Sequence, residues 1–269
     1  MIYFLIILAF ILFCILLYTF VLVKPKKHNS YNKNLLCNYA HRGLHSDNIP
    51  ENSLAAFGAA IQNGYGIELD VQLSKDGVVM VFHDYTLNRM TGVEKKLSDL
   101  SADELQKLHL NDTNQPIPAF RQVLELVDGK VPLLVELKGE NLDTALCEKV
   151  AELLYDYKGD YCIESFNPLL IKAIKKYLPN VFCGQLFTNV CRDKKKHSVL
   201  NIVLTFMALN FIAKPNFIAF NQTDRNALPV ILTTKLFKAP KFVWTINNKD
   251  DFDTALKNNE YAIFEKIAA

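Results

Sequence analysis

Two pairs of charged residues share the same spacing inside otherwise apolar segments. Glu68 and Asp70 stand two residues apart, and so do Glu136 and Lys138. In a strand, alternate side chains share one face, so each pair would lie on one side and the neighbouring Ile, Leu or Val side chains on the other. Charges that face the inside of a β structure are costly unless a bound metal or a charged substrate compensates them. The two pairs therefore predict a site for a charged ligand.

Two histidines stand at the ends of predicted strands. His41 opens a His-Arg-Gly sequence after the first strand candidate, and His83 opens a His-Asp sequence after the third. Catalytic residues of α/β barrels gather at the carboxyl ends of the strands. An imidazole with a pKa of about 6.5 gives or takes a proton near neutral pH. Together with the carboxylates, the histidines predict a metal site combined with an acid/base pair.

The segments that must position these residues alternate between strand-like and helix-like patterns. Helices are expected at 53–63, 143–157, 168–177 and 250–257, the first with a cap at Asn52. Strands are expected at 36–40, 66–71, 78–82, 133–137, 161–165, 182–187, 217–220, 242–246 and 261–264. Repeated β-then-α order indicates a parallel sheet with both faces covered, and the length suits a single α/β barrel.

The strand count does not fit a simple eight-stranded barrel. Nine candidates are one too many, and residues 74–77 are too few for a crossover helix. Either one strand is peripheral or the barrel is locally irregular. The stretch at about 85–131 is long between strands and contains its own helix start, a capping box of Ser101 and Glu104. We expect an insertion beside the site there.

The first residues form a long apolar segment. Residues 2–23 are apolar apart from Thr19, and as a helix they would extend roughly 33 Å, enough for a hydrocarbon core of about 30 Å. A cleavable signal peptide is the alternative, but its basic start and small-residue cleavage site are not visible. We predict a single-pass transmembrane anchor at 1–23, a linker at 24–35 and the barrel at 36–269.

The charges around the anchor predict its orientation. Lys24, Lys26 and Lys27 follow the apolar segment and no charged side chain precedes it, so the positive-inside rule places the barrel on the cytoplasmic side of the cell membrane. The net charge of +2, without a basic run interleaved with aromatics, argues against a nucleic-acid partner.

A second apolar segment lies late in the chain. Residues 199–213 are almost wholly apolar and follow Lys194, Lys195 and Lys196. Fifteen residues are short for a membrane span. The segment fits either a covered barrel helix, which we favour, or an interfacial segment that touches the bilayer.

Five motifs in a fixed order carry a family resemblance. They are His-Arg-Gly at 41–43, Pro-Glu-Asn-Ser at 50–53, Glu-x-Asp at 68–70, His-Asp at 83–84 and Glu-x-Lys at 136–138. In these motifs the sequence resembles the glycerophosphodiester phosphodiesterase family, and weaker similarities extend from about 38 to 250. Any one motif is weak evidence, but five in this order form a specific signal.

The resemblance implies a phospholipase-C-like TIM barrel, a (β/α)8 fold. Such a barrel would hydrolyse glycerophosphodiesters to sn-glycerol 3-phosphate and an alcohol, with a divalent metal. Carried onto the matching positions, the resemblance assigns Glu68, Asp70 and Glu136 to the metal and makes His41 and His83 the general acid and base.

Further roles follow from the same resemblance. Arg42 would neutralise the phosphate, Lys138 would assist at the metal or substrate, and Trp244 would pack against the glycerol. Phe166 could line the pocket, although an aromatic residue at a strand end is more often plain packing. Glu265 either replaces an acid that the family usually carries after its last strand, or the last turn is incomplete.

Glu51 and Asn52 have two interpretations. They either cap the following helix or orient the residues of the site from behind, and the sequence leaves both open.

The chemistry of the predicted ligands limits which metal ion would bind. Carboxylates without thiol or imidazole favour a hard cation, Mg²⁺ or Ca²⁺, over zinc. The cation and the planar fork of Arg42 would offset charge on a phosphorane-like transition state. The resemblance suggests that the substrate's own glycerol hydroxyl attacks and gives a cyclic phosphate, but direct attack by water stays equally open.

Plainer interpretations exist for each residue. His41 could be a buried structural histidine, and Glu68 with Asp70 could form salt bridges with Arg42 or Lys138. Jointly these interpretations need five coincidences at a barrel rim, so we favour a membrane-anchored metal-dependent phosphodiesterase. The alternatives are a lysophospholipase-D-type hydrolase on the same barrel, acting on lysophospholipids, and a non-catalytic membrane protein that binds glycerophosphoryl groups.

Overall fold

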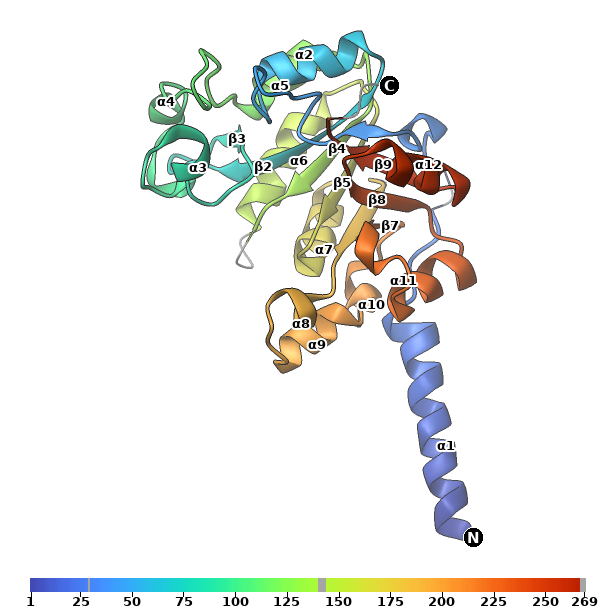
Figure 1. Cartoon of the computed structure of the whole chain (residues 1–269). Helices are drawn as coiled ribbons and strands as arrows, with labels where there is room; N and C mark the ends of the chain where they lie inside the picture. The colour runs from blue at the N-terminus through green and yellow to red at the C-terminus, as the bar shows by residue number, and fades with distance from the viewer. Residues whose placement is uncertain (29, 140–143, 267–269) are drawn as a thin grey trace.

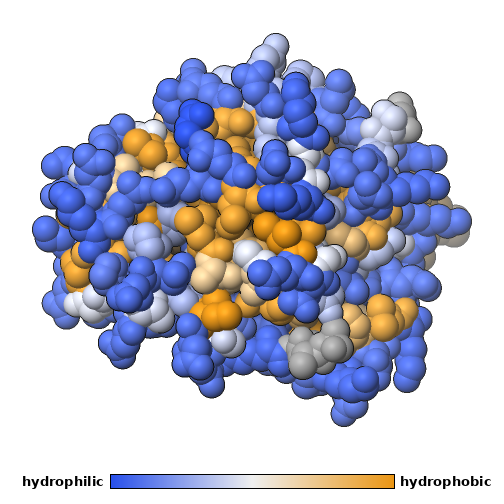
Figure 2. Space-filling model, turned by 90° about the horizontal axis from the view of Figure 1, so that it is seen from above, coloured by the Kyte–Doolittle hydropathy of each residue, from blue (hydrophilic) through white to orange (hydrophobic). Residues whose placement is uncertain are grey.

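A computed structural model describes residues 1–28, 30–139 and 144–266. Figure 1 shows a barrel with helices on its outside and one long helix, α1 (Ile2–Leu17), that projects away from it. Seen from the side opposite this helix, the surface is mostly hydrophilic, with apolar residues gathered towards the middle (Figure 2).

Nine strands form one sheet within the described residues. Eight of them are parallel and run in the order of the chain, and β1 pairs with both β2 and β9, so the barrel is closed. Their bounds are β1 (Tyr39–Ala40), β2 (Gly66–Leu73), β4 (Leu133–Leu137), β5 (Tyr161–Ser165), β6 (Cys183–Phe187), β7 (Phe217–Asn221), β8 (Lys241–Ile246) and β9 (Tyr261–Phe264). The ninth, β3 (Val79–Val81), is antiparallel to β2 and peripheral, which resolves the surplus strand of the sequence analysis.

The inward face of the strands changes character along the barrel axis. Leu134 on β4 and Cys162 on β5 belong to an apolar cluster that fills the amino-terminal part of the interior, together with Phe217 and Phe242. Two residues further along β4 and β5, the same face carries acids. Gly184 makes the apolar filling possible, because a Cβ at this position would lie 1.9 Å from the Phe217 ring.

Helices cover the outer face of the barrel (Figure 1). Apolar side chains such as Val135 and Ile163 point outward and pack in the main hydrophobic cluster. The helices are α2 (Leu54–Gln62), α5 (Phe120–Val127), α6 (Ala145–Tyr155), α7 (Pro168–Tyr177), α8 (Val190–Asp193), α9 (Val199–Thr205), α10 (Asn210–Ala213), α11 (Leu228–Ile231) and α12 (Lys249–Lys257), with the short turns η4 (Gln222–Asp224) and η5 (Leu232–Leu236). Asp143, the predicted first residue of the helix at 143–157, lies outside the described residues.

The cap of α2 differs from the prediction. The N-cap is Ser53, whose hydroxyl accepts a hydrogen bond from the backbone N–H of Ala56 at 3.1 Å. Asn52 is therefore not the N-cap. Its side chain hydrogen-bonds to Asp70 of the site instead.

The segment after β3 builds a small core of its own. It contains α3 (Asn88–Thr91), η3 (Leu97–Asp99) and α4 (Ala102–Leu105), and Met80, Leu87 and Leu105 are buried in a separate apolar cluster. The predicted capping box of Ser101 and Glu104 is present at the start of α4.

The apolar segment at 199–213 is not the single covered helix that we favoured. It forms α9 and α10, separated by a turn in which Met207 has a φ of 47°. Val199 is 80% exposed and Leu200 61% exposed, so the outer side of α9 faces away from the protein.

The N-terminal apolar segment is one continuous rod. Helix α1 continues as a π-helical turn, η1 (Tyr18–Leu22), and among the described residues this is the one helix long and apolar enough to cross a membrane, with a mean hydropathy of 3.1 over its best window and none of that window buried. Length and composition suit a signal sequence as well. The following stretch, with η2 (Lys33–Leu35), lies against the barrel, where the backbone N–H of Lys26 donates to the carbonyl of Pro215 at 2.7 Å.

Candidate active site

Three buried carboxylates meet inside the barrel at the carboxyl ends of β2 and β4. Asp70 and Glu136 are direct partners in the parallel register, and Glu68 precedes Asp70 by two residues on the same face. One oxygen of each carboxylate lies within 4.8 Å of the others. The spacing of charges in the sequence therefore corresponds to a real cluster.

Lys138 completes this cluster. Its Nζ lies 3.0 Å from Oδ1 of Asp70 and 2.8 Å from Oε1 of Glu136. The lysine therefore pairs with two carboxylates in this structure.

Burial and the neighbouring charges shift the pKa values of the three carboxylates in different directions. Burial raises the pKa of Glu68 well above its usual range, and the nearby Asp70 and Glu136 raise it further. Burial also raises the pKa of Glu136, to about 7, although Lys138 opposes the change. Burial alone would raise the pKa of Asp70, but Lys138 and other nearby positive charges outweigh it and hold that pKa below its usual range. The residues therefore fit a divalent cation, which would relieve the repulsion among oxygen ligands that hard cations prefer.

Glu164 is a fourth acid that the sequence analysis missed. It lies on β5 beside Glu136 in the register and is 1% exposed. Its Oε2 has no hydrogen-bond partner among the described residues. Burial, and then the charges of Glu68 and Glu136, raise the pKa of Glu164 well above its usual range. A sequence signal was available, because Glu164 is a lone acid in the predicted strand at 161–165 and follows the apolar residues Cys162 and Ile163.

The His-Arg-Gly sequence forms a tight turn after β1. Gly43 has a φ of 81°, and a Cβ there would lie 2.8 Å from Cβ of Ala56 at the start of α2. Arg42 also has a positive φ, and its backbone N–H donates to Oε2 of Glu68 at 2.8 Å. The turn thereby holds His41 and Arg42 over the carboxylates.

The side chain of Arg42 is engaged by acids. Nη1 donates to Oε1 of Glu51 at 2.8 Å, and Nε lies 3.6 Å from Oδ2 of Asp70. Although burial works against it, these charges raise the pKa of Arg42. Glu51 therefore fixes the guanidinium from behind, as one of the two interpretations of Glu51 expected.

Asn52 also supports the cluster. Its φ is 54°, and its Nδ2 donates to Oδ2 of Asp70 at 2.8 Å. With the cap supplied by Ser53, the structure favours the second interpretation of Asn52, in which it orients a carboxylate.

His83 reaches the site because β3 runs back along β2. The side-chain amide of Gln72 donates to the carbonyls of Phe82, His83 and Asp84 at 2.8, 3.1 and 2.9 Å and holds this stretch in place. Nδ1 of His83 lies 2.6 Å from Oδ1 of Asp84. Burial lowers the pKa of His83.

Arg89 connects the two halves of the rim. Its Nε donates to Oδ2 of Asp84 at 2.5 Å, and its Nη2 donates to Oε1 of Glu51 at 2.6 Å. Arg89 thereby links Asp84, which contacts His83, to Glu51, which contacts Arg42. The sequence analysis gave Arg89 no role.

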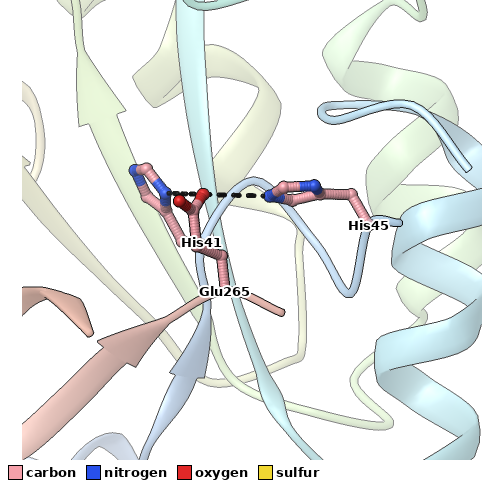
Figure 3. A group of neighbouring side chains, drawn as sticks. All are labelled: His41, His45 and Glu265. Atoms are coloured by element: carbon pink, nitrogen blue, oxygen red, sulfur yellow. Dashed lines mark hydrogen bonds and ion pairs between the residues drawn. The ribbon is translucent and has the colours of Figure 1, made fainter. Parts of the chain in front are cut away.

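His41 has a carboxylate behind it as well (Figure 3). Oε2 of Glu265, directly after β9, lies 3.3 Å from Nδ1 of His41 and 3.2 Å from Nε2 of His45. Hydrogen bonds from both histidines lower the pKa of Glu265, and burial lowers the pKa of His41. Glu265 takes the position of the expected acid, whereas the part played by His45 was not foreseen.

The same three residues are close enough to hold an ion. One donor atom of each lies within 4.8 Å of the others. Two imidazoles with a carboxylate suit zinc better than a hard cation. Because Nδ1 of His41 faces this cluster, its other ring nitrogen faces the carboxylates, with Nε2 4.0 Å from Oε2 of Glu68.

Two aromatic side chains form the wall of the site that lies opposite the charged residues. The rings of Phe166 and Trp244 meet edge to face with centroids 5.6 Å apart, and Nε1 of Trp244 is buried without a hydrogen-bond partner among the described residues. A cavity of about 90 Å³ lies between these rings and the charged residues. It is lined by both catalytic candidates, Arg42, Lys138 and the acids Glu68, Glu136 and Glu164.

This arrangement can be compared with known proteins. The sequence profile of the glycerophosphoryl diester phosphodiesterase family matches residues 41–264, which contain all of these side chains except Glu265. The chain belongs to this family. The predicted family and its enzyme class, a phosphodiesterase, are confirmed.

Relatives of the phosphodiesterase family cover part of the chain. A glycerophosphodiester phosphodiesterase of Caldanaerobacter subterraneus is 37% identical over 55% of this chain and 65% of its own length. A rat protein named lysophospholipase D is 33% identical over 55% of this chain and 49% of its own length. The chain thus spans about half to two thirds of these relatives.

The family fold is confirmed by a solved structure. An Oleispira antarctica phosphodiesterase in complex with the product sn-glycerol 3-phosphate is 24% identical, with a TM-score of 0.69 over 85% of this chain and 92% of that chain. The similarity shows a shared barrel fold.

Proposed function

We propose that the protein is a membrane-anchored, metal-dependent glycerophosphodiester phosphodiesterase. It hydrolyses glycerophosphodiesters to sn-glycerol 3-phosphate and an alcohol. One observation carries the proposal: a cluster of three buried carboxylates lies at a small cavity of the barrel rim, and two of them, Glu68 and Glu136, line that cavity together with His41 and His83. The family and the names of the relatives agree with this activity.

Glu68, Asp70 and Glu136 would hold the cation, Mg²⁺ or Ca²⁺. Their oxygens alone make up the donor set, which these cations prefer. When bound, the cation offsets negative charge on the phosphate. Lys138, already paired with two of the carboxylates, favours their ionised forms and holds them in place.

His41 and His83 supply the proton transfers. One imidazole takes the proton of the attacking oxygen, and the other gives a proton to the oxygen of the leaving alcohol. Each ring is held through Nδ1, by Glu265 in one case and by Asp84 in the other, so that the second nitrogen faces the substrate.

Other residues bind and orient the substrate. Arg42 lies at the rim beside Asp70 and offers its planar fork to the phosphate oxygens. Phe166 and Trp244 form an apolar wall against which the carbon skeleton of the glycerol packs. Glu51 and Asn52 hold Arg42 and Asp70 from behind.

The attacking oxygen comes either from water or from the glycerol of the substrate. The two routes differ in an observable product, because attack by the glycerol hydroxyl passes through a cyclic phosphate. Phosphorus NMR of a reaction stopped during turnover separates them.

The anchor proposal rests on the apolar rod at 2–22. Its exposed aliphatic side chains each favour insertion by roughly 0.3–0.6 kcal/mol at the centre of a membrane. The lysines at 24, 26 and 27 support a barrel on the cytoplasmic side, by the positive-inside rule.

The deciding experiment is a metal-dependent assay of the full chain on several glycerophosphodiesters and lysophospholipids. Hydrolysis of glycerophosphodiesters with Mg²⁺ or Ca²⁺, lost on chelation, is expected. Turnover of lysophospholipids alone would favour the lysophospholipase-D-type alternative. Tight binding of glycerophosphoryl groups without any turnover would favour the non-catalytic alternative.

A further inference from the structure

A second cavity adjoins the catalytic one. It has a volume of about 270 Å³ and shares Phe166 and Leu186 with the smaller cavity around the carboxylates. Its wall is mostly apolar and includes Val203 and Leu204 of α9 and Met207. An apolar space of this size beside a small polar site has the composition of a ligand pocket, and its volume is close to the lower end of the usual range, roughly 300 Å³.

The α9–α10 segment that helps to line the second cavity also contacts the apolar rod. Phe206, directly after α9, packs edge to face on Tyr18 of η1 with ring centroids 6.0 Å apart, and its carbonyl accepts a hydrogen bond from the Tyr18 hydroxyl at 3.0 Å. The side chain of Asn210 donates to the carbonyl of Val23 at 2.8 Å. Figure 1 shows α10 beside the barrel end of the rod. With the rod in the membrane, as proposed above, these contacts would put the α9–α10 segment at the membrane surface.

The outer side of α9 suits a lipid surface. Val199, Leu200 and Ile202 are exposed although they are apolar, and Lys194, Lys195 and Lys196 precede them. Apolar side chains that enter the lipid interface beside basic residues that attract anionic headgroups are typical of interfacial helices. The interfacial interpretation of 199–213 thus agrees with the exposed side chains better than a covered helix does.

The catalytic cavity alone is too small for a lipid. About 90 Å³ accommodates a glycerophosphate group but leaves no space for an acyl chain. We propose that the apolar cavity binds the single acyl chain of a lysophospholipid taken from the bilayer, with its glycerophosphate in the catalytic cavity. This inference rests on the proposed function and names its substrate class.

A single acyl chain fits this cavity better than two. The cavity is one pocket of limited volume, and attack by the glycerol hydroxyl would need a free hydroxyl beside the phosphate. In the overall reaction, the P–O bond to the headgroup alcohol breaks, water supplies the oxygen of the new P–O bond, and its protons go to the alcohol and the medium. The products are lysophosphatidate and the alcohol.

The test compares two substrates that release the same alcohol. The full chain in phosphatidylcholine vesicles receives glycerophosphocholine or palmitoyl-lysophosphatidylcholine with Mg²⁺ or Ca²⁺, and released choline is measured. Val203→Trp fills the apolar cavity, while Val78→Trp adds the same side chain at an exposed position before β3, outside both cavities and away from the exposed side of α9. We expect Val203→Trp to lower kcat/KM for the lysophospholipid by about tenfold or more. Its hydrolysis of glycerophosphocholine, and both activities of Val78→Trp, should stay within about twofold of the unchanged chain.

The outcomes separate the two proposals. Hydrolysis of glycerophosphocholine without hydrolysis of the lysophospholipid overturns the acyl-chain pocket and leaves the proposed function standing. Cleavage of neither substrate with either cation overturns the proposed function. If Val203→Trp loses both activities, Leu204→Phe, a smaller filling, replaces it, and equal losses on both substrates in that variant also overturn the pocket.

Discussion

Glu265 contacts His41 across the seam where the barrel closes, with Oε2 3.3 Å from Nδ1. The residues are far apart in the chain and meet because β9 pairs with β1. The contact places the hydrogen of the neutral ring on Nδ1 and leaves Nε2 as the acceptor that faces the carboxylates. His83 has the same relationship to Asp84, so both catalytic candidates are oriented by an acid.

Glu265→Gln should lower kcat by about 10- to 100-fold while KM and cation affinity stay within about twofold. The amide keeps the shape but no longer stabilises the protonated imidazole of His41. Steady-state kinetics of the full chain would measure the effect. Glu265→Asp should recover part of the rate, and Glu94→Gln, which removes an exposed carboxylate elsewhere, serves as the control. A rise in KM without a change in kcat would contradict the orienting role of Glu265.

The same carboxylate predicts a pH dependence of stability. Hydrogen bonds from His41 and His45 lower the pKa of Glu265 below the unfolded value of about 4.3. The stabilisation of the fold by ionised Glu265 is therefore complete above the unfolded pKa, and it fades as the pH falls towards the folded pKa. The melting temperature of Glu265→Gln should lie below that of the unchanged chain at pH 7, and the gap should narrow below about pH 4. A gap that widens in acid would refute this assignment.

Replacement of either catalytic histidine should nearly abolish turnover. His41→Ala and His83→Ala should each reduce kcat by about 10²- to 10⁴-fold, because each removes one proton transfer. Calorimetric titration with Mg²⁺ or Ca²⁺ should show cation binding within about twofold in both variants, since neither ring belongs to the oxygen donor set. Full turnover in either variant would overturn the corresponding role.

Much of this site follows from local sequence patterns. All nine strand segments were expected, because short apolar runs bounded by polar loops are typical of buried parallel strands. The two-residue repeat of strands put Glu68 and Asp70 on one face, and the family resemblance grouped them with Glu136. Local pattern also marked the capping box of α4.

The sequence did not predict the contacts that depend on closure of the barrel. Arg89 joins Glu51 to Asp84, and His45 shares Glu265 with His41, yet no local pattern relates these residues. At the break between α9 and α10, Phe206 packs on Tyr18 of the apolar rod, a tertiary contact that no local pattern indicates. Tertiary packing thus decided what periodicity left open.

Removal of one carboxylate should weaken cation binding. Glu136→Gln keeps the side-chain shape but removes a charged oxygen ligand, so the affinity for Mg²⁺ or Ca²⁺ should fall by about tenfold or more. Calorimetric titration of the full chain would measure it. Chelation should abolish the activity of the unchanged chain, and Mg²⁺ or Ca²⁺ should restore it better than Zn²⁺. Unchanged affinity in Glu136→Gln would remove Glu136 from the donor set.

The lysines after the apolar rod should place the barrel in the cytoplasm. Lys24, Lys26 and Lys27 resist translocation, so a fluorescent protein fused to the C-terminus should fold and fluoresce, while alkaline phosphatase at the same point should stay inactive. Replacement of the three lysines by glutamine should weaken this preference and give a mixed population. Intact mass spectrometry of the membrane fraction checks the anchor itself, because an uncleaved chain retains residues 2–23. Active phosphatase with a fluorescence-silent fusion would reverse the orientation, and a mass that lacks the rod would replace the anchor by a signal sequence.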